Sequence, residues 1–305
     1  MKICIIIPTF NPGKYAEDIL KMVIAEKERG IDCVIIDSSS NDDSEKYINS
    51  SSRKFLVIPK GAFDHGGTRN IAAKLASDFG AEILLFMTQD ALLATEDSIE
   101  KLCAPILSGK AAAVYGRQLP RFNASPNERY ARYHQYGPNL EYRTLSDVKR
   151  IGVRAFRFSN VFSAVRTDEF WKVGGFPERT ILNEDMLLAA KLLRAGETIA
   201  YVGGSAVYHS HDYTPWQQLT RNFDIGVSFT EAGALLQGAR TGGEGIRFAI
   251  GQLRYLIRIG EYRAILGAIV DLGSRWIGFK LGAQHERLPL ALKKKLSMHS
   301  YHWDQ

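Results

Sequence analysis

The first hundred residues alternate short apolar runs with segments of helical periodicity. The runs that read as buried strands lie at 2–10, 32–36, 55–59 and 81–90. The segments that read as helices lie at 15–29, 43–49 and 67–80. Strands that alternate with helices at this spacing predict a parallel sheet with helices on both faces. Because ligands of such sheets bind at the carboxyl ends of the strands, the polar residues that follow each strand are the first candidates for a site.

Beyond residue 110 the pattern is less regular. Residues 116–150 are rich in Arg, Tyr, Asn and Pro and predict a long loop with one helix. Strands are expected at 155–165 and 198–208, and helices at 167–173, at 183–195 with Asn183 as its cap, and from 246 to about 283.

Composition and charge narrow the class of protein. The 305 residues are 45% apolar, enough for one large domain or two joined halves. No run approaches the roughly 18 to 20 apolar residues that span a bilayer, and the N-terminal apolar stretch is too short for a signal peptide, so we expect a cytoplasmic protein. The three cysteines have no metal-like spacing and are expected to be buried free thiols.

The net charge of +6 belongs to the C-terminal segment. Residues 240–305 hold 11 Lys and Arg against 5 Asp and Glu, which accounts for the whole excess. A local basic excess predicts an anionic surface nearby, such as lipid headgroups or nucleic acid.

Two acids follow predicted strands. Asp37 opens the turn DSSSNDDS, where it either caps a helix or accepts a hydrogen bond from a nucleotide base or ribose. Asp90 ends the most apolar strand, where it either terminates the strand or holds Mg²⁺ or Mn²⁺ against a diphosphate.

Three further segments carry candidate chemistry. Arg69 lies in GGTRN at a helix start, where it either neutralises a phosphate or is solvated. Glu184 and Asp185 open a helix, as partners of its dipole or, in one of them, as a general base. His209 and His211 alternate at a strand end, either as metal ligands or as surface histidines. No nucleophile elbow, phosphate-binding P-loop, zinc-type cysteine pair or dinucleotide GxGxxG is present in the sequence.

The order of these segments is more specific than any one of them. Strands ending in PTFN and in Asp37, then GGTRN, QDA, NED and YHSH, follow one another along the chain. In this order the chain resembles the family 2 inverting glycosyltransferases of GT-A fold, over about residues 1–230. The segments that look like the bacterial rhamnosyltransferases of cell-surface polysaccharide synthesis are FDHGGTRN, TQDA, FSNVFSAVRTDEFWKVGGFPE, NEDMLLAAKLLRAG and HSHDYTPWQQLTRNFDIG.

The resemblance implies a Rossmann-like, GT-A-like α/β fold with a mostly parallel sheet and a helical C-terminal extension. Residues 1–95 would form the nucleotide-sugar-binding half, residues 96–240 the acceptor-binding and catalytic half of the same domain, and residues 241–305 a basic helical extension. The implied reaction moves L-rhamnose from dTDP-β-L-rhamnose to a saccharide or lipid-linked saccharide, with inversion and with Mg²⁺ or Mn²⁺ as cofactor.

The same resemblance implies a role for each matching position. Asp185 is the catalytic base, and Asp90, with His209, holds the metal; the first acid of the family's DxD motif is absent, since the positions read Thr88-Gln89-Asp90. The remaining roles are donor binding, by Thr9, Asp37, Arg69 and Asp90, and shaping of the acceptor side, by Trp171, Gly175 and Glu184.

Alternatives remain at this stage. The first is a family 2 enzyme with another nucleotide sugar, and the second is a non-catalytic nucleotide-sugar-binding protein. A nucleotidyltransferase would need a Gly-rich basic loop after the first strand, where the chain has PTFNPGKY.

The extension 241–305 is expected to contact the inner face of the plasma membrane, or alternatively a second subunit as a homodimer. We expect no nucleic-acid partner, because an acceptor-binding loop explains the Arg and Tyr residues of 129–136 equally well.

Overall fold

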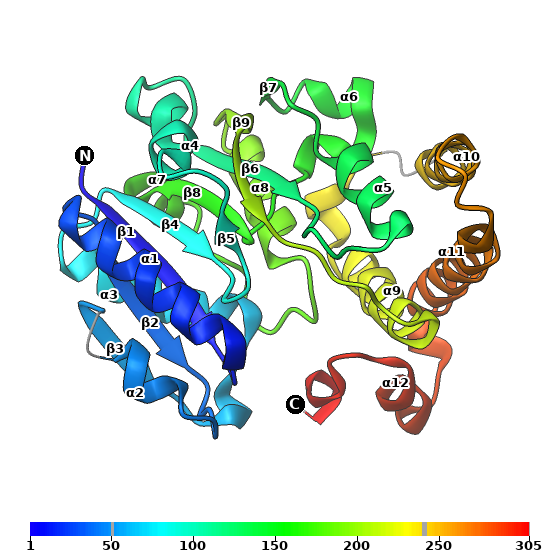
Figure 1. The fold of residues 1–305 in the computed structure, drawn as a ribbon, viewed down its shortest axis with the longest axis horizontal. Helices are drawn as coiled ribbons and strands as arrows, with labels where there is room; N and C mark the ends of the chain where they lie inside the picture. The colour runs from blue at the N-terminus through cyan, green and yellow to red at the C-terminus, as the bar shows by residue number, and fades with distance from the viewer. Residues whose placement is uncertain (50–51, 240–242, 305) are drawn as a thin grey trace.

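A computed structural model describes residues 1–49, 52–239 and 243–304. Its centre is one sheet with the strand order β3-β2-β1-β4-β8-β6-β9-β5, and β7 also pairs with β9 (Figure 1). The strands are β1 (Ile3–Thr9), β2 (Asp32–Asp37), β3 (Lys54–Val57), β4 (Ile83–Met87), β5 (Leu92–Leu93), β6 (Ala113–Leu119), β7 (Leu140–Arg143), β8 (Phe162–Arg166) and β9 (Ile199–Tyr208).

The predicted parallel sheet is confirmed for its first four strands, where β1 pairs in parallel with β2 and β4, and β2 with β3. The whole sheet is mixed, because β8 runs antiparallel to both β4 and β6 while β6 and β9 are parallel. The carboxyl ends of β1, β2, β4, β6 and β9 therefore lie at one edge, and β8 begins at that same edge.

Helices cover both faces of the sheet, as predicted. The helices are α1 (Ala16–Glu28), α2 (Ser44–Ile48), α3 (His65–Asp78), α4 (Ser98–Leu107), α5 (Pro126–Gln135), α6 (Asp147–Ile151), α7 (Thr167–Lys172), α8 (Glu184–Arg194), α9 (Pro215–Glu231), α10 (Glu244–Arg258), α11 (Tyr262–Gly282) and α12 (Leu290–Leu296). Ile5 and Ile7 of β1 pack with α1 and α4, whereas Cys4 and Ile6 pack with α3 and α8. This double coverage explains why the strands read as continuous apolar runs. The three cysteines are buried and free, as expected.

Several predicted elements differ from those observed. The strand expected at 155–165 is only β8, because Gly152–Phe156 forms a 3₁₀ turn. The loop expected at 116–150 contains α5, β7 and α6. The helical pattern from 246 is two helices, α10 and α11, which are separated at Gly260 by its left-handed backbone (φ 77°).

The C-terminal extension packs on the rest of the chain through α9 and α11. A Cβ atom at Gly282 would lie 1.9 Å from the Phe223 carbonyl oxygen, and one at Gly278 would lie 2.2 Å from that of Leu219. Glycine is thus what lets the two helix backbones approach so closely. The predicted boundary at 240/241 and residue 305 lie outside the described residues. Among the described helices, none combines the length and the apolar character needed to cross a bilayer.

Candidate active site

The carboxyl ends of β1 and β2 place two predicted donor-binding residues side by side. Thr9 and Asp37 are register partners, and the Thr9 hydroxyl donates to Asp37 Oδ2 at 2.8 Å. The same carboxylate accepts from the backbone N–H and the hydroxyl of Ser40, at 2.7 and 2.6 Å. Because Thr9 and Asp37 are both buried, Asp37 is held as a fixed acceptor at the edge where ligands of such sheets bind.

In the segment Thr88-Gln89-Asp90, the Gln89 side chain binds the backbone of Phe10. Its Oε1 accepts from the Phe10 N–H at 2.8 Å, and its Nε2 donates to the Phe10 carbonyl at 3.0 Å. This pair of bonds ties the loop after β1 to the loop after β4. Asp90 is left as the one carboxylate of the segment that faces the histidines.

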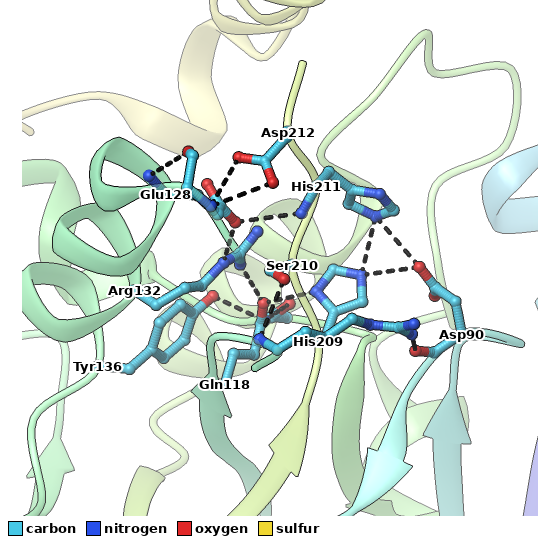
Figure 2. Close-up of polar contacts among 12 residues, drawn as sticks. Asp90, Gln118, Glu128, Arg132, Tyr136, His209, Ser210, His211 and Asp212 are labelled. Carbon is cyan, nitrogen blue, oxygen red and sulfur yellow. Dashed lines mark hydrogen bonds and ion pairs between the residues drawn. The ribbon is translucent and has the colours of Figure 1, made fainter. Parts of the chain in front are cut away.

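Three side chains from two distant segments meet at the ends of β4 and β9. His209 and His211 alternate along an extended segment, so both imidazoles lie on the same side as Asp90 (Figure 2). Asp90 Oδ2 lies 3.3 Å from His209 Nε2 and 3.1 Å from His211 Nε2, and the two Nε2 atoms are 3.1 Å apart. The sequence leaves open which histidine lies beside Asp90, and in the structure both histidines do.

A polar layer behind His209 fixes its tautomer. His209 Nδ1 lies 3.0 Å from Gln118 Oε1, and the Arg132 guanidinium donates to the same atom. Because Arg132 can only donate, this atom is the amide oxygen, and His209 Nδ1 must carry the proton. The lone pair of Nε2 is then directed at Asp90 and His211, as it is in histidines that bind metals.

The layer is itself held by further hydrogen bonds. Gln118 Nε2 donates to the Tyr136 hydroxyl at 2.7 Å, and Arg132 Nε donates to Glu128 Oε1 at 2.6 Å. Glu128 also accepts from the His211 backbone N–H at 3.2 Å. These residues come from β6, α5 and the segment that follows α5 (Figure 2). No single sequence motif relates them. Sequence reasoning missed Gln118 and Glu128, and it placed Arg132 and Tyr136 in an acceptor-binding loop without linking them to His209.

The chemistry of this cluster fits a divalent cation. One carboxylate oxygen and two imidazole nitrogens lie within 4.8 Å of one another. Carboxylates suit Mg²⁺ and Mn²⁺ and imidazoles suit transition-metal ions, so the set fits a divalent transition-metal ion. Although burial disfavours the charged form, contact with the imidazoles of His209 and His211 holds the pKa of Asp90 well below its usual range. Burial lowers the pKa of His209 to about 4. An ionised carboxylate and a neutral imidazole are the forms that bind metals.

Asp185 lies in the first turn of α8, at the same edge. Its Oδ2 accepts from the Asn160 N–H at 3.2 Å and its Oδ1 from the Met186 N–H at 2.7 Å. Burial, followed by the negative charge of Glu184, raises the pKa of Asp185 well above its usual range. Such a carboxylate is a better proton acceptor near neutral pH than an ordinary one. Asn160 reaches it because the antiparallel β8 starts at this edge.

The loop before α8 is fastened to α9. Asn183 is the N-cap residue, but its backbone is left-handed (φ 65°) and its side chain makes no capping bond. Its amide donates instead to Ser228 Oγ at 3.1 Å, and the Ser228 hydroxyl donates to the Leu182 carbonyl at 2.8 Å. The prediction of Asn183 as the cap residue is therefore confirmed for its position, whereas its side chain binds α9 and not the start of α8.

A buried ion pair lies directly beside Asp185. Arg69 Nη1 is 3.2 Å from Glu184 Oε1, with 6% and 7% of the two side chains exposed. Arg69 also donates to the His65 carbonyl at 2.8 Å. Although burial disfavours the carboxylate, Arg69 and then His65 hold the pKa of Glu184 below its usual range. Arg69, which the resemblance places near the diphosphate, is thus engaged by Glu184, and Glu184 is the neighbour of the predicted base.

The predicted acceptor-side residues Trp171 and Gly175 lie along α3. The Trp171 indole donates to Ser77 Oγ at 2.9 Å, and Ser77 is near the far end of that helix, about 18 Å along its axis from the first residue. Gly175 has a φ of 61°, and its carbonyl accepts from Lys191 Nζ at 3.0 Å. The structure does not bring Trp171 to Asp185, and the acceptor-side role of both residues stays a prediction.

A cavity of about 420 Å³ opens beside the metal-ligand cluster, and Arg221 and Asn222 of α9 form part of its wall. Within the described ranges the Arg221 guanidinium has no hydrogen bond or ion pair, and it lies over the Tyr213 ring at 5.6 Å from the centroid. Other arginines of the wall are already paired, Arg132 with Glu128 and Arg275 with Asp271. Arg221 is thus available to an anion in the cavity, and sequence reasoning missed it.

Solved structures share this fold and include complexes with nucleotide sugars. Staphylococcus aureus TarS 1–349, in complex with UDP-GlcNAc, aligns with a TM-score of 0.55 at 16% identity, over 93% of this chain and 92% of that one. The Pyrobaculum calidifontis mannosyltransferase PcManGT, in complex with GDP-Man and Mn²⁺, aligns with a TM-score of 0.57 at 15% identity, over 99% and 85% of the two chains. These likenesses establish the GT-A fold.

Sequence comparison gives the family. The glycosyl transferase family 2 profile matches residues 4–173. The O-antigen chain rhamnosyltransferase WbaN of Salmonella anatum is 35% identical over 98% of this chain and 95% of its own length. RfbN of Salmonella typhimurium, with the same description, is 35% identical over 100% and 96%. This chain therefore belongs to glycosyl transferase family 2 and is a glycosyltransferase of GT-A fold.

Proposed function

We propose that this glycosyltransferase moves L-rhamnose from dTDP-β-L-rhamnose to a saccharide or lipid-linked saccharide acceptor, in cytoplasmic assembly of a cell-surface polysaccharide. The observation that carries the proposal is the 35% identity to two O-antigen chain rhamnosyltransferases over almost the whole chain. That identity extends beyond the family profile, which ends at residue 173, and so spans the segments that hold Asp185 and the two histidines.

In this proposal residues 1–95 bind the donor, and residues 96–240 contain the base and receive the acceptor. Thr9 and Asp37 contact the nucleotide, and Asp90, His209 and His211 hold Mg²⁺ or Mn²⁺. A divalent ion held there supplies positive charge for the donor diphosphate. Gln118 keeps the His209 ring in the orientation that binding requires.

Asp185 is the proposed general base. It takes the proton of an acceptor hydroxyl, and the hydroxyl oxygen forms a bond to the anomeric carbon while the bond from that carbon to the diphosphate oxygen breaks. Attack from the face opposite the leaving group inverts the centre, so a β-linked donor gives an α-linked product. The electron pair leaves with the nucleoside diphosphate, and no covalent enzyme intermediate is needed.

Arg221 is the cation that we assign to the leaving diphosphate. It lines the cavity beside Asp90 and is unpaired in the described part of the chain, whereas Arg69 is buried against Glu184. A guanidinium that faces developing negative charge stabilises the transition state. In this assignment Arg69 acts indirectly, by holding Glu184 next to the base.

We further propose that α10 and α11 contact an anionic membrane surface. Their exposed apolar side chains include Ile246, Leu266 and Trp276, which are 69%, 71% and 65% exposed. Arg254, Arg258 and Arg263 lie on the same two helices and are exposed. Adjacent apolar and basic stripes are what a membrane-surface helix needs, and each basic residue near an anionic leaflet contributes about 1 kcal/mol.

Vesicle sedimentation tests this contact. The full chain should bind anionic vesicles at low salt, and Leu266→Glu with Trp276→Glu should abolish binding, whereas Phe122→Ser, at a fully exposed site outside the extension, should not. If the protein does not bind the vesicles but forms a dimer, and these same substitutions dissociate that dimer, then a second subunit covers this face.

A donor panel tests the proposed sugar. Ligand binding raises the apparent melting temperature by mass action, so dTDP-L-rhamnose should stabilise the protein more than UDP- or GDP-hexoses at equal concentration. Release of dTDP should follow the same order. Stronger stabilisation and faster turnover with a UDP-hexose would contradict the donor assignment and leave a family 2 enzyme of another specificity.

A further inference from the structure

The last residues of the chain return to the predicted catalytic base. We call Ser297–Asp304 the C-terminal strap; it follows α12 and runs back past α9 toward the N-terminal half (Figure 1). Leu296, just before the strap, and Trp303 within it pack with Leu182 and Phe223. Leu182 precedes Asn183 in the loop before α8. The strap thus forms part of the apolar support of the loop that carries Asp185.

A buried carboxylate anchors the strap to α9. Asp224 is 0% exposed, and its Oδ2 accepts from the backbone N–H groups of Met298 and His299 at 2.9 and 3.2 Å. Burial of a carboxylate is unfavourable unless hydrogen bonds compensate for lost water. Asp224 also lies one helical turn after Arg221, so the strap is fixed close to the cation that faces the cavity.

The ring of His299 brings the strap into contact with the start of α3. His299 meets His65 edge to face, with ring centroids 4.8 Å apart and planes at 87°. His65 Nε2 is buried and has no hydrogen-bond partner in the described part of the chain. The His65 ring is therefore held by ring contacts, with His299 and with Phe63, whose ring centroid lies 5.0 Å away.

From His65 a short series of contacts leads to the base. The His65 carbonyl accepts from Arg69, whose guanidinium pairs with Glu184. Glu184 is the residue before Asp185 at the N-terminus of α8. His299 and Asp185 lie more than a hundred positions apart in sequence, and this series of contacts connects them.

We propose that the C-terminal strap is a working part of the active site, in which His299 is a positioning residue that acts through His65 and the Arg69–Glu184 pair on Asp185. Asp224 is the anchor that keeps the strap in place. The proposal rests on the proposed role of Asp185 as base. A general base must sit within a few tenths of an ångström of its working position, and a displacement of about 1 Å lowers turnover by about 100-fold.

The first test compares His299→Ala with His299→Phe and His302→Ala. Phe keeps a ring against His65 and should retain turnover, whereas Ala removes the contact and should lower kcat by about 10- to 100-fold. The donor KM should change little, because the predicted nucleotide contacts of Thr9 and Asp37 lie at the ends of β1 and β2. His302→Ala is the matched control, since this ring is in the same strap but contacts Trp303. Equal kcat values for His299→Ala and His302→Ala would overturn the proposal.

If His299→Ala fails to fold, a second pair of variants tests the role of the C-terminal strap. Asp224→Asn keeps an oxygen for the two backbone N–H groups and should retain turnover, whereas Asp224→Leu, of similar size, should lower kcat without raising the donor KM. Equal kcat values for these two variants would contradict the proposal. The wild-type enzyme and Asp185→Asn serve as references: if Asp185→Asn remains active, the proposed function is wrong, whereas an inactive Asp185→Asn with a fully active His299→Ala contradicts only the role of the strap.

Discussion

Asp185 is the side chain whose removal should have the most specific effect. Asp185→Asn keeps the shape of the residue and one accepting oxygen, but it cannot take a proton from an acceptor hydroxyl. We expect turnover to fall by about 10²- to 10⁴-fold, the usual contribution of a general base, while donor affinity changes by less than about twofold. Initial rates and a donor titration measure the two effects.

Asp168→Asn is the matched control for this substitution. Asp168 is also an acid in the first turn of a helix, but it is exposed and pairs with Arg166. If Asp185→Asn turns over as fast as Asp168→Asn does, Asp185 is only a partner of its helix dipole.

The pH dependence of the reaction follows from the same residue. Burial and the charge of Glu184 raise the pKa of Asp185 to about 7. Because a base acts only when deprotonated, kcat/KM should be full above this pKa and fall as the pH drops through it. Glu184→Gln removes the negative neighbour and should move the midpoint of the pH–rate profile to lower pH. A midpoint that stays in place or rises would contradict this account of Asp185.

The metal cluster gives a third prediction at this scale. Excess EDTA should stop transfer, and Asp90→Ala should do the same. Gln118→Leu keeps all three ligands but releases the His209 ring, so Mn²⁺ affinity should fall by about 10- to 100-fold. Titration with Mn²⁺ by electron paramagnetic resonance measures it, with the exposed Gln237→Leu as control. Full transfer in excess EDTA would show that Arg221 serves the diphosphate without a metal.

Site residues could be predicted from the sequence where the neighbouring residues indicate their place in a strand or helix. Asp90 and the histidines end strands, so a parallel sheet places them at one edge, and the structure brings them together. Gln118 and Arg132 could not be found this way, because their contact with His209 depends on how β6, α5 and β9 meet. The pairing of Arg69 with Glu184 is likewise a contact between distant helices.

At the scale of elements, α9 is the main omission from the sequence prediction. Its sequence carried a start signal that could have been recognised, since Thr214 and Gln217 form a capping box and Pro215 is the first helical residue. The omission matters for function, because α9 supplies Arg221 to the cavity and Asp224 to the C-terminal strap.

The packing of α9 against α11 predicts opposite effects for two glycine substitutions in α11. Gly282→Ala would place a Cβ 1.9 Å from the Phe223 carbonyl oxygen, and the forced separation should destabilise the fold by about 1–3 kcal/mol. Gly273 has open space where a Cβ would be, so Gly273→Ala should stabilise it by about 0.5–1 kcal/mol. Urea unfolding measures both. Equal effects of the two substitutions would show that the helices are not closely packed in solution.

At the scale of the whole molecule, the sequence predicts the parallel half of the sheet and places the site at the carboxyl ends of its strands. It does not predict the antiparallel β8, because the apolar run of a strand carries no information on its direction. The reversal places Asn160 beside Asp185, so the part of the topology that was not predictable completes the site. The basic extension is predictable as helical, whereas its return to the base through the strap depends on contacts far apart in sequence.

The most direct test of the account is the anomeric configuration of the product. Purified enzyme with dTDP-β-L-rhamnose, Mn²⁺ and a saccharide acceptor should yield dTDP and a new rhamnoside, and one-bond carbon–proton coupling at the anomeric position measures its configuration by nuclear magnetic resonance. We expect an α-linked L-rhamnoside from the wild-type enzyme and no product from Asp185→Asn. A β-linked product would mean retention and a different mechanism, and transfer from other nucleotide sugars but not from this donor would contradict the proposed substrate.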